Sequence, residues 1–213
     1  MTDRFTAKMM VVGDIGTNCY IMQNTETKAA LIVDPGDEAE RIADAVREEG
    51  GKPEAILLTH GHHDHIMAVG KLREQFPDCK VYIGAKEKGM LTQPLGMFPG
   101  TPSDYMKEPD VWVSDGEELS LIGTSFSVIE TPGHTKGSVC YWNREEGLLF
   151  SGDTLFRGSC GRTDFPGGSA KEMQASLKKL KERIPDDAYV LPGHMNTSVM
   201  ANEKRFNPFM AGL

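Results

Sequence analysis

The chain lacks any apolar run long enough to cross a bilayer, and its start has no basic segment followed by an apolar stretch of the kind that secretory leaders carry. Its 213 residues also contain no long run of like charge and no low-complexity tract. These absences disfavour membrane proteins and disordered proteins. They predict a soluble, cytoplasmic protein with no membrane partner.

Cysteine is scarce and scattered. Cys19, Cys79, Cys140 and Cys160 show no C-x-x-C spacing, and a chain of this length does not need disulfide bonds to stabilise its core. We therefore interpret all four as reduced thiols, most of them buried.

Positive charge is in deficit, because 23 Lys and Arg face 31 Asp and Glu, which gives a formal net charge of −8. Such a surface disfavours non-specific binding to phosphate backbones, so nucleic acid is not an expected partner. The hydrophobic fraction of 39% and the charged fraction of 25% are those of an ordinary globular protein with a substantial core.

Apolar runs bounded by turn residues predict the secondary structure. Strands are expected at Lys8 to Gly13, Asn18 to Gln23, Ala29 to Asp34, Ala55 to Leu58, Leu119 to Ile122, Ser125 to Glu130, Ser138 to Trp142, Leu148 to Ser151 and Ala188 to Leu191. Helices are expected from an N-cap at Asp37 to about Gly50, from Asp64 to about Phe76, and from an N-cap at Ser169 to Pro185.

Both halves of the chain repeat a block of strands closed by helices, which predicts an α/β fold in which two sheets pack together and helices cover the outside. We expect a single domain over residues 1–213, as a monomer or a homodimer. From Thr92 to Pro109, Pro, Gly and Met recur without periodicity, so this stretch is predicted to be a loop that either covers the site or contacts a second copy.

Five of the six histidines directly follow predicted strands, as do two aspartates. The candidate ligands are His60, His62, Asp64, His65, His134, Asp153 and His194, whereas His63 is interpreted as a bystander. Strand ends are where open α/β folds build their sites. Imidazoles and carboxylates without matching thiolates suit zinc, iron or manganese in a catalytic site. Seven ligands exceed the needs of one tetrahedral ion and suit two ions that share a carboxylate.

The motifs that contain these residues resemble the metallo-β-lactamase superfamily, and most closely its glyoxalase II (hydroxyacylglutathione hydrolase) branch. They are T-N-C-Y at 17–20, D-P-G at 34–36, T-H-G-H-H-D-H at 59–65, T-P-G-H-T at 131–135, S-G-D-T at 151–154 and P-G-H at 192–194. The resemblance implies a four-layer αββα sandwich. It assigns His60, His62 and His134 to a first metal, Asp64, His65 and His194 to a second, and Asp153 to both.

This assignment implies a metal-dependent hydrolase. Two divalent ions, zinc being expected and iron or manganese the alternatives, would lower the pKa of a shared water enough to supply a hydroxide that attacks an acyl carbon. Asp64 and Asp153 would orient and deprotonate that water. Asp34 is either a partner of a ligand histidine or a turn-forming aspartate before proline.

The expected substrate is a small thioester or ester, such as S-2-hydroxyacylglutathione. Cys160-Gly161-Arg162 resembles the C-G-K/R segment near the glutathione region of glyoxalase II, so Arg162 is either a clamp for a substrate carboxylate or part of a structural salt bridge. Cys160 is expected to be structural. Only 19 residues follow His194, fewer than in the helical C-terminal region that glyoxalase II uses for glutathione, so the expectation extends to other thioesters and esters.

Three alternatives remain open at this stage. The segment from Cys160 to Phe165 also resembles persulfide dioxygenases, which would place one Fe(II) on His60, His134 and Asp153. A lactonase would use the same two-metal site, and a metal-binding or electron-transfer module would show no turnover. Antibiotic hydrolysis is not expected, because His65 stands where typical zinc β-lactamases have arginine and Asp153 stands where many have cysteine. His62 stands where flavodiiron oxygen reductases have glutamate, which disfavours that branch.

Overall fold

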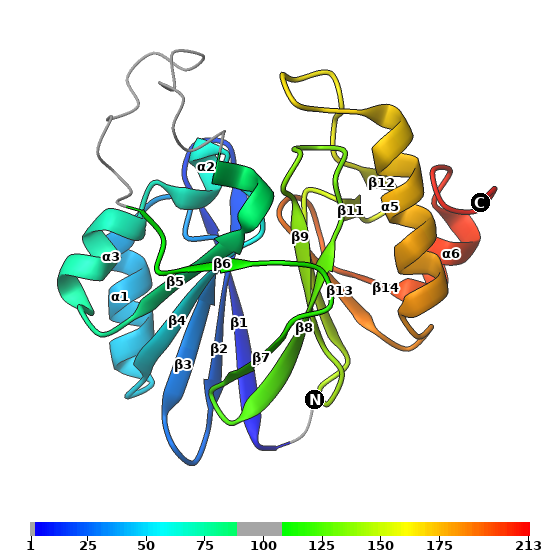
Figure 1. The fold of residues 1–213 in the computed structure, drawn as a ribbon. Coiled ribbons are helices and arrows are strands. Elements are labelled where there is room, and N and C mark those ends of the chain that lie inside the picture. The colour runs from blue at the N-terminus through cyan, green and yellow to red at the C-terminus, as the bar shows by residue number, and fades with distance from the viewer. Residues whose placement is uncertain (1–2, 89–107) are drawn as a thin grey trace.

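The computed structural model describes residues 3–88 and 108–213. It is a four-layer sandwich in which two six-stranded sheets face each other and helices cover both outer faces (Figure 1). This arrangement confirms the αββα architecture expected from the sequence. The predicted loop from Thr92 to Pro109 lies almost entirely outside the described residues.

The first sheet comes from the first half of the chain. Its strands, in spatial order, are β1 (Phe5–Val12), β2 (Thr17–Asn24), β3 (Ala29–Val33), β4 (Lys52–Leu58), β5 (Lys80–Gly84) and β6 (Val111–Val113). The first three strands pair antiparallel, and β3 through β6 pair parallel. The parallel strands therefore end at one edge of the sheet.

The second sheet comes from the second half. Its order is β14 (Ser198–Val199), β13 (Tyr189–Pro192), β10 (Leu148–Gly152), β9 (Val139–Asn143), β8 (Thr124–Glu130) and β7 (Glu118–Leu121). Only β10 and β13 pair parallel. A small hairpin of β11 (Leu155–Phe156) and β12 (Ser159–Cys160) follows β10.

Strand β4 shows why the inner strands are apolar on both faces. Ile56 and Leu58 pack toward the helices on the outer face, whereas Ala55 and Leu57 pack between the two sheets. Successive side chains of a strand point to opposite faces, so a strand covered on both sides is a continuous apolar run rather than an alternating one.

Helices α1 (Ala39–Glu48) and α3 (Val69–Gln75) cover the first sheet, and α5 (Ala170–Arg183) and α6 (Met200–Phe206) cover the second (Figure 1). The third predicted helix is confirmed at its start, since the Ser169 hydroxyl accepts a hydrogen bond from the Glu172 backbone N–H. Its apolar stripe, Met173, Leu177, Leu180 and Ile184, is buried. Among the described residues, no helix has the length and apolarity required to cross a membrane.

Two helix predictions need correction. The N-cap of α1 is Glu38, in a left-handed conformation, and not Asp37, whose carboxylate instead accepts the Glu38 backbone N–H. The helix expected from Asp64 to Phe76 is two pieces, because α2 (His63–Ile66) ends before α3 begins. The break lets α2 follow the ligand loop while α3 packs on the sheet.

Candidate metal centre

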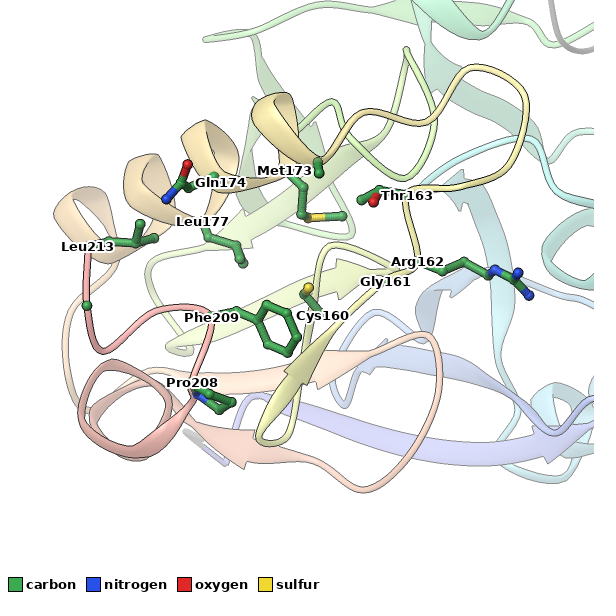
Figure 2. Close-up of a pocket in the computed structure, with 12 residues that line it drawn as sticks. Cys160, Gly161, Arg162, Thr163, Met173, Gln174, Leu177, Pro208, Phe209 and Leu213 are labelled. Carbon is green, nitrogen blue, oxygen red and sulfur yellow. The ribbon is translucent and has the colours of Figure 1, made fainter.

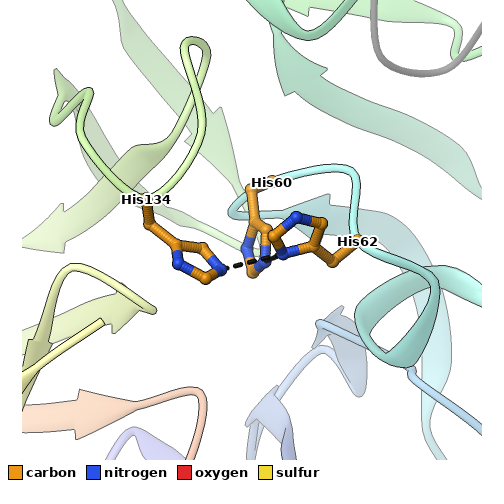
Figure 3. A group of neighbouring side chains, drawn as sticks. All are labelled: His60, His62 and His134. Carbon is orange, nitrogen blue, oxygen red and sulfur yellow. Dashed lines mark hydrogen bonds between the residues drawn. The ribbon is translucent and has the colours of Figure 1, made fainter. Parts of the chain in front are cut away.

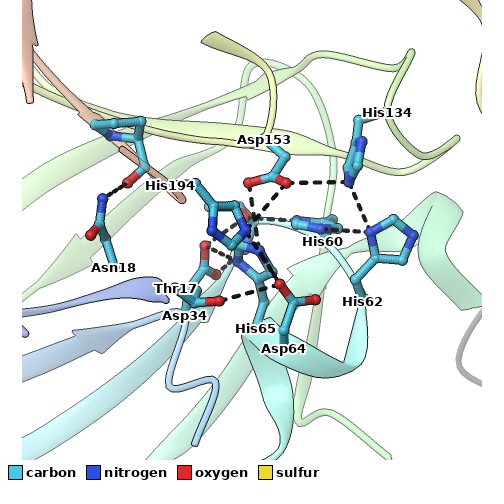
Figure 4. A network of polar contacts seen from close by, with 12 residues as sticks. Thr17, Asn18, Asp34, His60, His62, Asp64, His65, His134, Asp153 and His194 are labelled. Atoms are coloured by element: carbon cyan, nitrogen blue, oxygen red, sulfur yellow. Dashed lines mark hydrogen bonds and ion pairs between the residues drawn. The ribbon is translucent and has the colours of Figure 1, made fainter. Parts of the chain in front are cut away.

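Four strand ends deliver the predicted ligands to one edge of the sandwich (Figure 4). The T-H-G-H-H-D-H segment follows β4, His134 follows β8, Asp153 follows β10 and His194 follows β13. Sequence-distant segments therefore meet where the two sheets open, as the positions after strands predicted. The structure brings together all seven predicted ligands, in three overlapping groups that share His60 and His65. His63 belongs to none of these groups.

The first group consists of three imidazoles (Figure 3). Nδ1 of His62 lies 3.0 Å from Nε2 of His60 and 2.8 Å from Nε2 of His134. Nitrogens held about 2.0–2.1 Å from a tetrahedral zinc ion are about 3.3 Å apart, so both of these pairs are close to the spacing of zinc ligands.

The second group combines Asp64, His65 and His194. The Asp64 carboxylate lies 3.2 Å from Nε2 of His194 and 3.5 Å from Nε2 of His65. Asp153 lies between the groups, since its oxygens are 3.4 Å from Nε2 of His134 and 3.5 Å from Nε2 of His65. A carboxylate in this position can serve two ions.

Two buried atoms test whether a cation fits here. Nε2 of His65 and Oδ1 of Asp153 have no hydrogen-bond partner within the described part of the chain. Buried polar atoms are almost always satisfied, and these two face each other across 3.5 Å. Together with the histidine and carboxylate donor set, they fit divalent metal ions.

Hydrogen bonds behind the imidazoles fix which nitrogen faces the centre. Nδ1 of His134 donates to the backbone carbonyl of Arg162 at 2.8 Å, which directs Nε2 toward the centre. Nδ1 of His60 lies 3.1 Å from the Thr59 hydroxyl, which itself donates to Asp34. Nδ1 of His65 donates to the same Asp34 carboxylate. Asp34 is therefore buried beneath two candidate ligands.

Burial and neighbouring charges shift the pKa values of the candidate ligands in different directions. Burial lowers the pKa of His62 to about 3, with the neighbouring His134 imidazole adding to the shift. Burial would also lower the pKa of His65, but the carboxylates of Asp153 and Asp34 outweigh it and raise that pKa to about 10. Burial opposes ionisation of Asp64, yet the hydrogen bond with His194 and the His65 charge hold its pKa well below the usual value.

The sequence did not reveal two residues that position ligand loops. Asn18 is buried and donates through its amide to the carbonyls of Pro192 and Met195, on either side of His194. Glu87 is buried behind the first group. Asn18 lay inside a motif that the sequence singled out, although its function did not follow from the motif, whereas Glu87 belongs to no recognisable pattern.

The three predicted substrate residues line a cavity of about 580 Å³ (Figure 2). The walls of this cavity come from Cys160–Thr163, from α5 and from the C-terminal residues. Met173, Leu177 and Phe209 make much of the cavity apolar. Burial raises the pKa of the Cys160 thiol, which disfavours a reactive thiolate.

The Arg162 side chain points away from that cavity (Figure 2). Its guanidinium makes two hydrogen bonds of 2.7 Å with Asp164 and lies 3.9 Å from the centre of the Phe165 ring. The Phe165 ring is in turn 5.8 Å from the His62 ring. Arg162 is thus in a salt bridge with Asp164. As a clamp, it would bind a substrate carboxylate in place of Asp164.

Comparison with known proteins supports a family assignment. The family model described as the metallo-beta-lactamase superfamily matches residues 12–194. A relative in Haemophilus influenzae, named hydroxyacylglutathione hydrolase GloC, is 36% identical over 199 residues, which cover 91% of this chain and 92% of that protein.

Solved structures show the same fold. The B3 metallo-beta-lactamase BLEG-1 is 37% identical with a TM-score of 0.91, over 97% of this chain and 100% of that one. The di-iron-bound form of TTHA1623 is 35% identical with a TM-score of 0.81, over 95% and 99%. ETHE1 from Myxococcus xanthus is 29% identical with a TM-score of 0.80, over 97% and 85%.

Proposed function

This chain belongs to the metallo-β-lactamase superfamily, and on that premise we propose that it is a binuclear metal-dependent hydrolase of thioesters or esters, with S-2-hydroxyacylglutathione as a candidate substrate. The observation that carries the proposal is the convergence of seven ligand side chains in groups that overlap at His60 and His65. The relative named hydroxyacylglutathione hydrolase supports the choice of a thioester.

Divalent ions bound by these groups would lower the pKa of a water molecule and polarise the substrate carbonyl. The protein itself supplies orientation and proton transfer. Asp64 is held by a hydrogen bond from the Thr17 hydroxyl, and its lowered pKa keeps it ionised. We propose that Asp64 and Asp153 orient the attacking water and accept its proton.

Zinc is the proposed metal, because a group of three imidazoles suits it. The same donors accept iron or manganese, and a structural neighbour is described in a di-iron-bound form. The proposed partners are small molecules and not nucleic acid. The protein would act as a monomer or a homodimer.

The cavity beside Cys160 supports a substrate with an apolar portion. Its size lies within the range of about 300–1,000 Å³ typical of small-molecule pockets, and Gly161 links it to the metal centre. A β-carbon on Gly161 would lie 1.9 Å from the Asp153 carbonyl oxygen, so the cavity wall packs directly on the residue between the groups.

Metal content and turnover measured on the same preparation test the proposal. Protein purified without added metal is analysed for elemental composition, and it is assayed with S-lactoylglutathione, a lactone and a β-lactam. We expect about two metals per chain and thioester cleavage. Bound metal with turnover of only the lactone or the β-lactam would overturn the substrate class. A B3 metallo-β-lactamase as a structural neighbour makes the β-lactam assay necessary.

Persulfide oxidation is the second candidate. It is favoured by the segment Cys160 to Phe165 and would use one iron ion on His60, His134 and Asp153. The burial of His65 beside Asp64 supports the binuclear alternative, because one iron on His60, His134 and Asp153 would leave His65 and Asp64 without a ligand role. One iron per chain, with oxygen uptake on glutathione persulfide and no cleavage, would favour the dioxygenase.

A further inference from the structure

Glu87 is a buried carboxylate outside the ligand set. It is the last residue of a short 3-10 helix (Ala85–Glu87) that follows β5, and its side chain is 1% exposed. Burial raises the pKa of this carboxyl, although several hydrogen bonds oppose the shift. A buried acidic group is destabilising unless its oxygens accept hydrogen bonds. The donors that bind Glu87 therefore indicate which segments it holds.

The two oxygens of Glu87 bind two different loops. Oε2 accepts the backbone N–H of Gly61 at 2.9 Å. Oε1 accepts the Thr135 hydroxyl at 2.5 Å and the backbone N–H of Gly137 at 2.8 Å. One loop follows β4 in the first sheet, and the other follows β8 in the second. A single carboxylate therefore joins the two halves of the sandwich.

Both loops carry the first ligand group. Gly61 lies between His60 and His62, and Thr135 directly follows His134. All three imidazoles of that group thus come from segments that are hydrogen-bonded to Glu87. In the second group, Asp64 and His65 come from the segment after Gly61, and His194 comes from a loop that does not bind Glu87 in the described structure.

The loop that contains Gly137 packs closely against Glu87. A β-carbon on Gly137 would lie 2.3 Å from the backbone nitrogen of Glu87 and 2.8 Å from its Cγ. The loop after His134 therefore rests directly on the 3-10 helix. The Thr135 hydroxyl is also 2.7 Å from that of Ser138, which orients it toward Glu87.

We infer that Glu87 is a positioning residue that sets the separation of the two loops bearing His60, His62 and His134, and thereby tunes metal affinity at that group. The inference rests on the metal-binding part of the proposed function and is independent of the substrate. Outer partners of metal ligands commonly change metal affinity by about 10–100-fold when they are removed.

The substitution Glu87→Gln tests this role with almost no change of volume. A glutamine places an N–H₂ group where an oxygen now accepts, so at least one amide hydrogen faces a backbone or hydroxyl donor. Glu118→Gln is the matched control, because Glu118 lies on the edge strand β7 and accepts from the hydroxyls of Ser125 and Ser127.

Zinc affinity is measured by chelator competition, with ¹⁵N-labelled histidine ring signals reporting each group. We expect Glu87→Gln to weaken zinc binding about 10–100-fold at His60, His62 and His134, and to leave binding at His65 and His194 unchanged. Glu118→Gln should match the wild type at both groups. Wild-type affinity in Glu87→Gln, or equal weakening at both groups, would overturn the inference.

Thr135→Val provides a milder test if Glu87→Gln folds poorly. It removes one of the three donors to Glu87 and keeps the two backbone bonds, so we expect a smaller loss at the same three histidines. The double variant, with both Glu87→Gln and Thr135→Val, should lose less free energy of zinc binding than the two single variants lose together, because both substitutions act through one hydrogen-bond network. Full additivity would contradict the inference, and failure of the wild type to bind any metal would instead overturn the proposed function on which it rests.

Discussion

The Asp34 carboxylate lies 3.0 Å from Nδ1 of His65, and both side chains are buried. The same carboxylate accepts the backbone N–H and the hydroxyl of Thr59 at 2.8 and 2.7 Å. Asp34 holds this position with a φ of 49°, a backbone conformation that is uncommon outside glycine. The contact directs Nε2 of His65 toward Asp153.

Asp34→Asn should weaken metal binding at the group that contains His65. The amide N–H₂ can face Nδ1 of His65, which then becomes an acceptor and moves the ring proton to Nε2, the atom aimed at the metal. We expect affinity at this group to fall about 10–100-fold, measured by chelator competition. Asp44→Asn, at an exposed position on α1, is the control. Unchanged affinity in Asp34→Asn would show that Asp34 serves the turn alone.

Metal binding should release a proton between pH 7 and pH 9. The raised pKa of His65, about 10, means that its ring is protonated in the metal-free protein over this range. A metal ion replaces that proton, so affinity should rise about tenfold per pH unit. Calorimetry in buffers of different ionisation enthalpy measures the release.

The raised pKa of His65 also makes the stability of the metal-free protein depend on pH. A histidine whose pKa is raised by folding stabilises the fold fully below the unfolded value of about 6.5. That contribution is lost as the pH rises toward about 10. His65→Gln should abolish the proton release, and its persistence in that variant would identify another titrating group.

Gly193→Ala should disturb the site and the fold together. Its β-carbon would lie 2.3 Å from Oδ1 of Asp153 and 2.7 Å from Cε1 of His65. Overpacking of this kind costs about 1–3 kcal/mol, which a fall of several degrees in Tm would reveal. Gly212→Ala, where a β-carbon meets nothing within 4 Å, is the control. Equal Tm values for the two variants would contradict the predicted clash.

Substitutions at Arg162 and Asp164 distinguish a clamp for a substrate carboxylate from a structural salt bridge. Both side chains are largely exposed, so the stability effect of either substitution should be small. If Arg162 binds a substrate carboxylate, Arg162→Met raises KM at unchanged kcat, and Asp164→Asn lowers KM by freeing the guanidinium. Steady-state kinetics at two salt concentrations measure both parameters. Unchanged KM in both variants would assign Arg162 to the surface pair.

The sequence predicted the ligand edge because each ligand follows an apolar strand and lies near a glycine or threonine. Parallel strands such as β3, β4 and β5 bring such positions to one edge, so a linear pattern implies a spatial cluster. The assignment of individual ligands to particular ions stays a prediction, as do the single-domain boundary and the cytoplasmic location.

Other elements escaped prediction for identifiable reasons. Strand β6 has only three residues, and Lys80, Tyr82 and Gly84 interrupt the apolar pattern of β5. The break between α2 and α3 leaves the apolar stripe intact, so periodicity alone predicted one helix. Glu87 acts through bonds to residues that are distant in sequence, which no local pattern contains.

Each ligand group draws on both halves of the chain. His62 and His134, whose ring nitrogens are 2.8 Å apart, are separated by 72 residues, and His194 joins Asp64 and His65 from the opposite end of the sequence. An ion held by either group would cross-link the two sheets and would be lost when they separate. Metal retention would therefore report how firmly the halves are docked, and chelation should loosen the whole sandwich as well as abolish turnover.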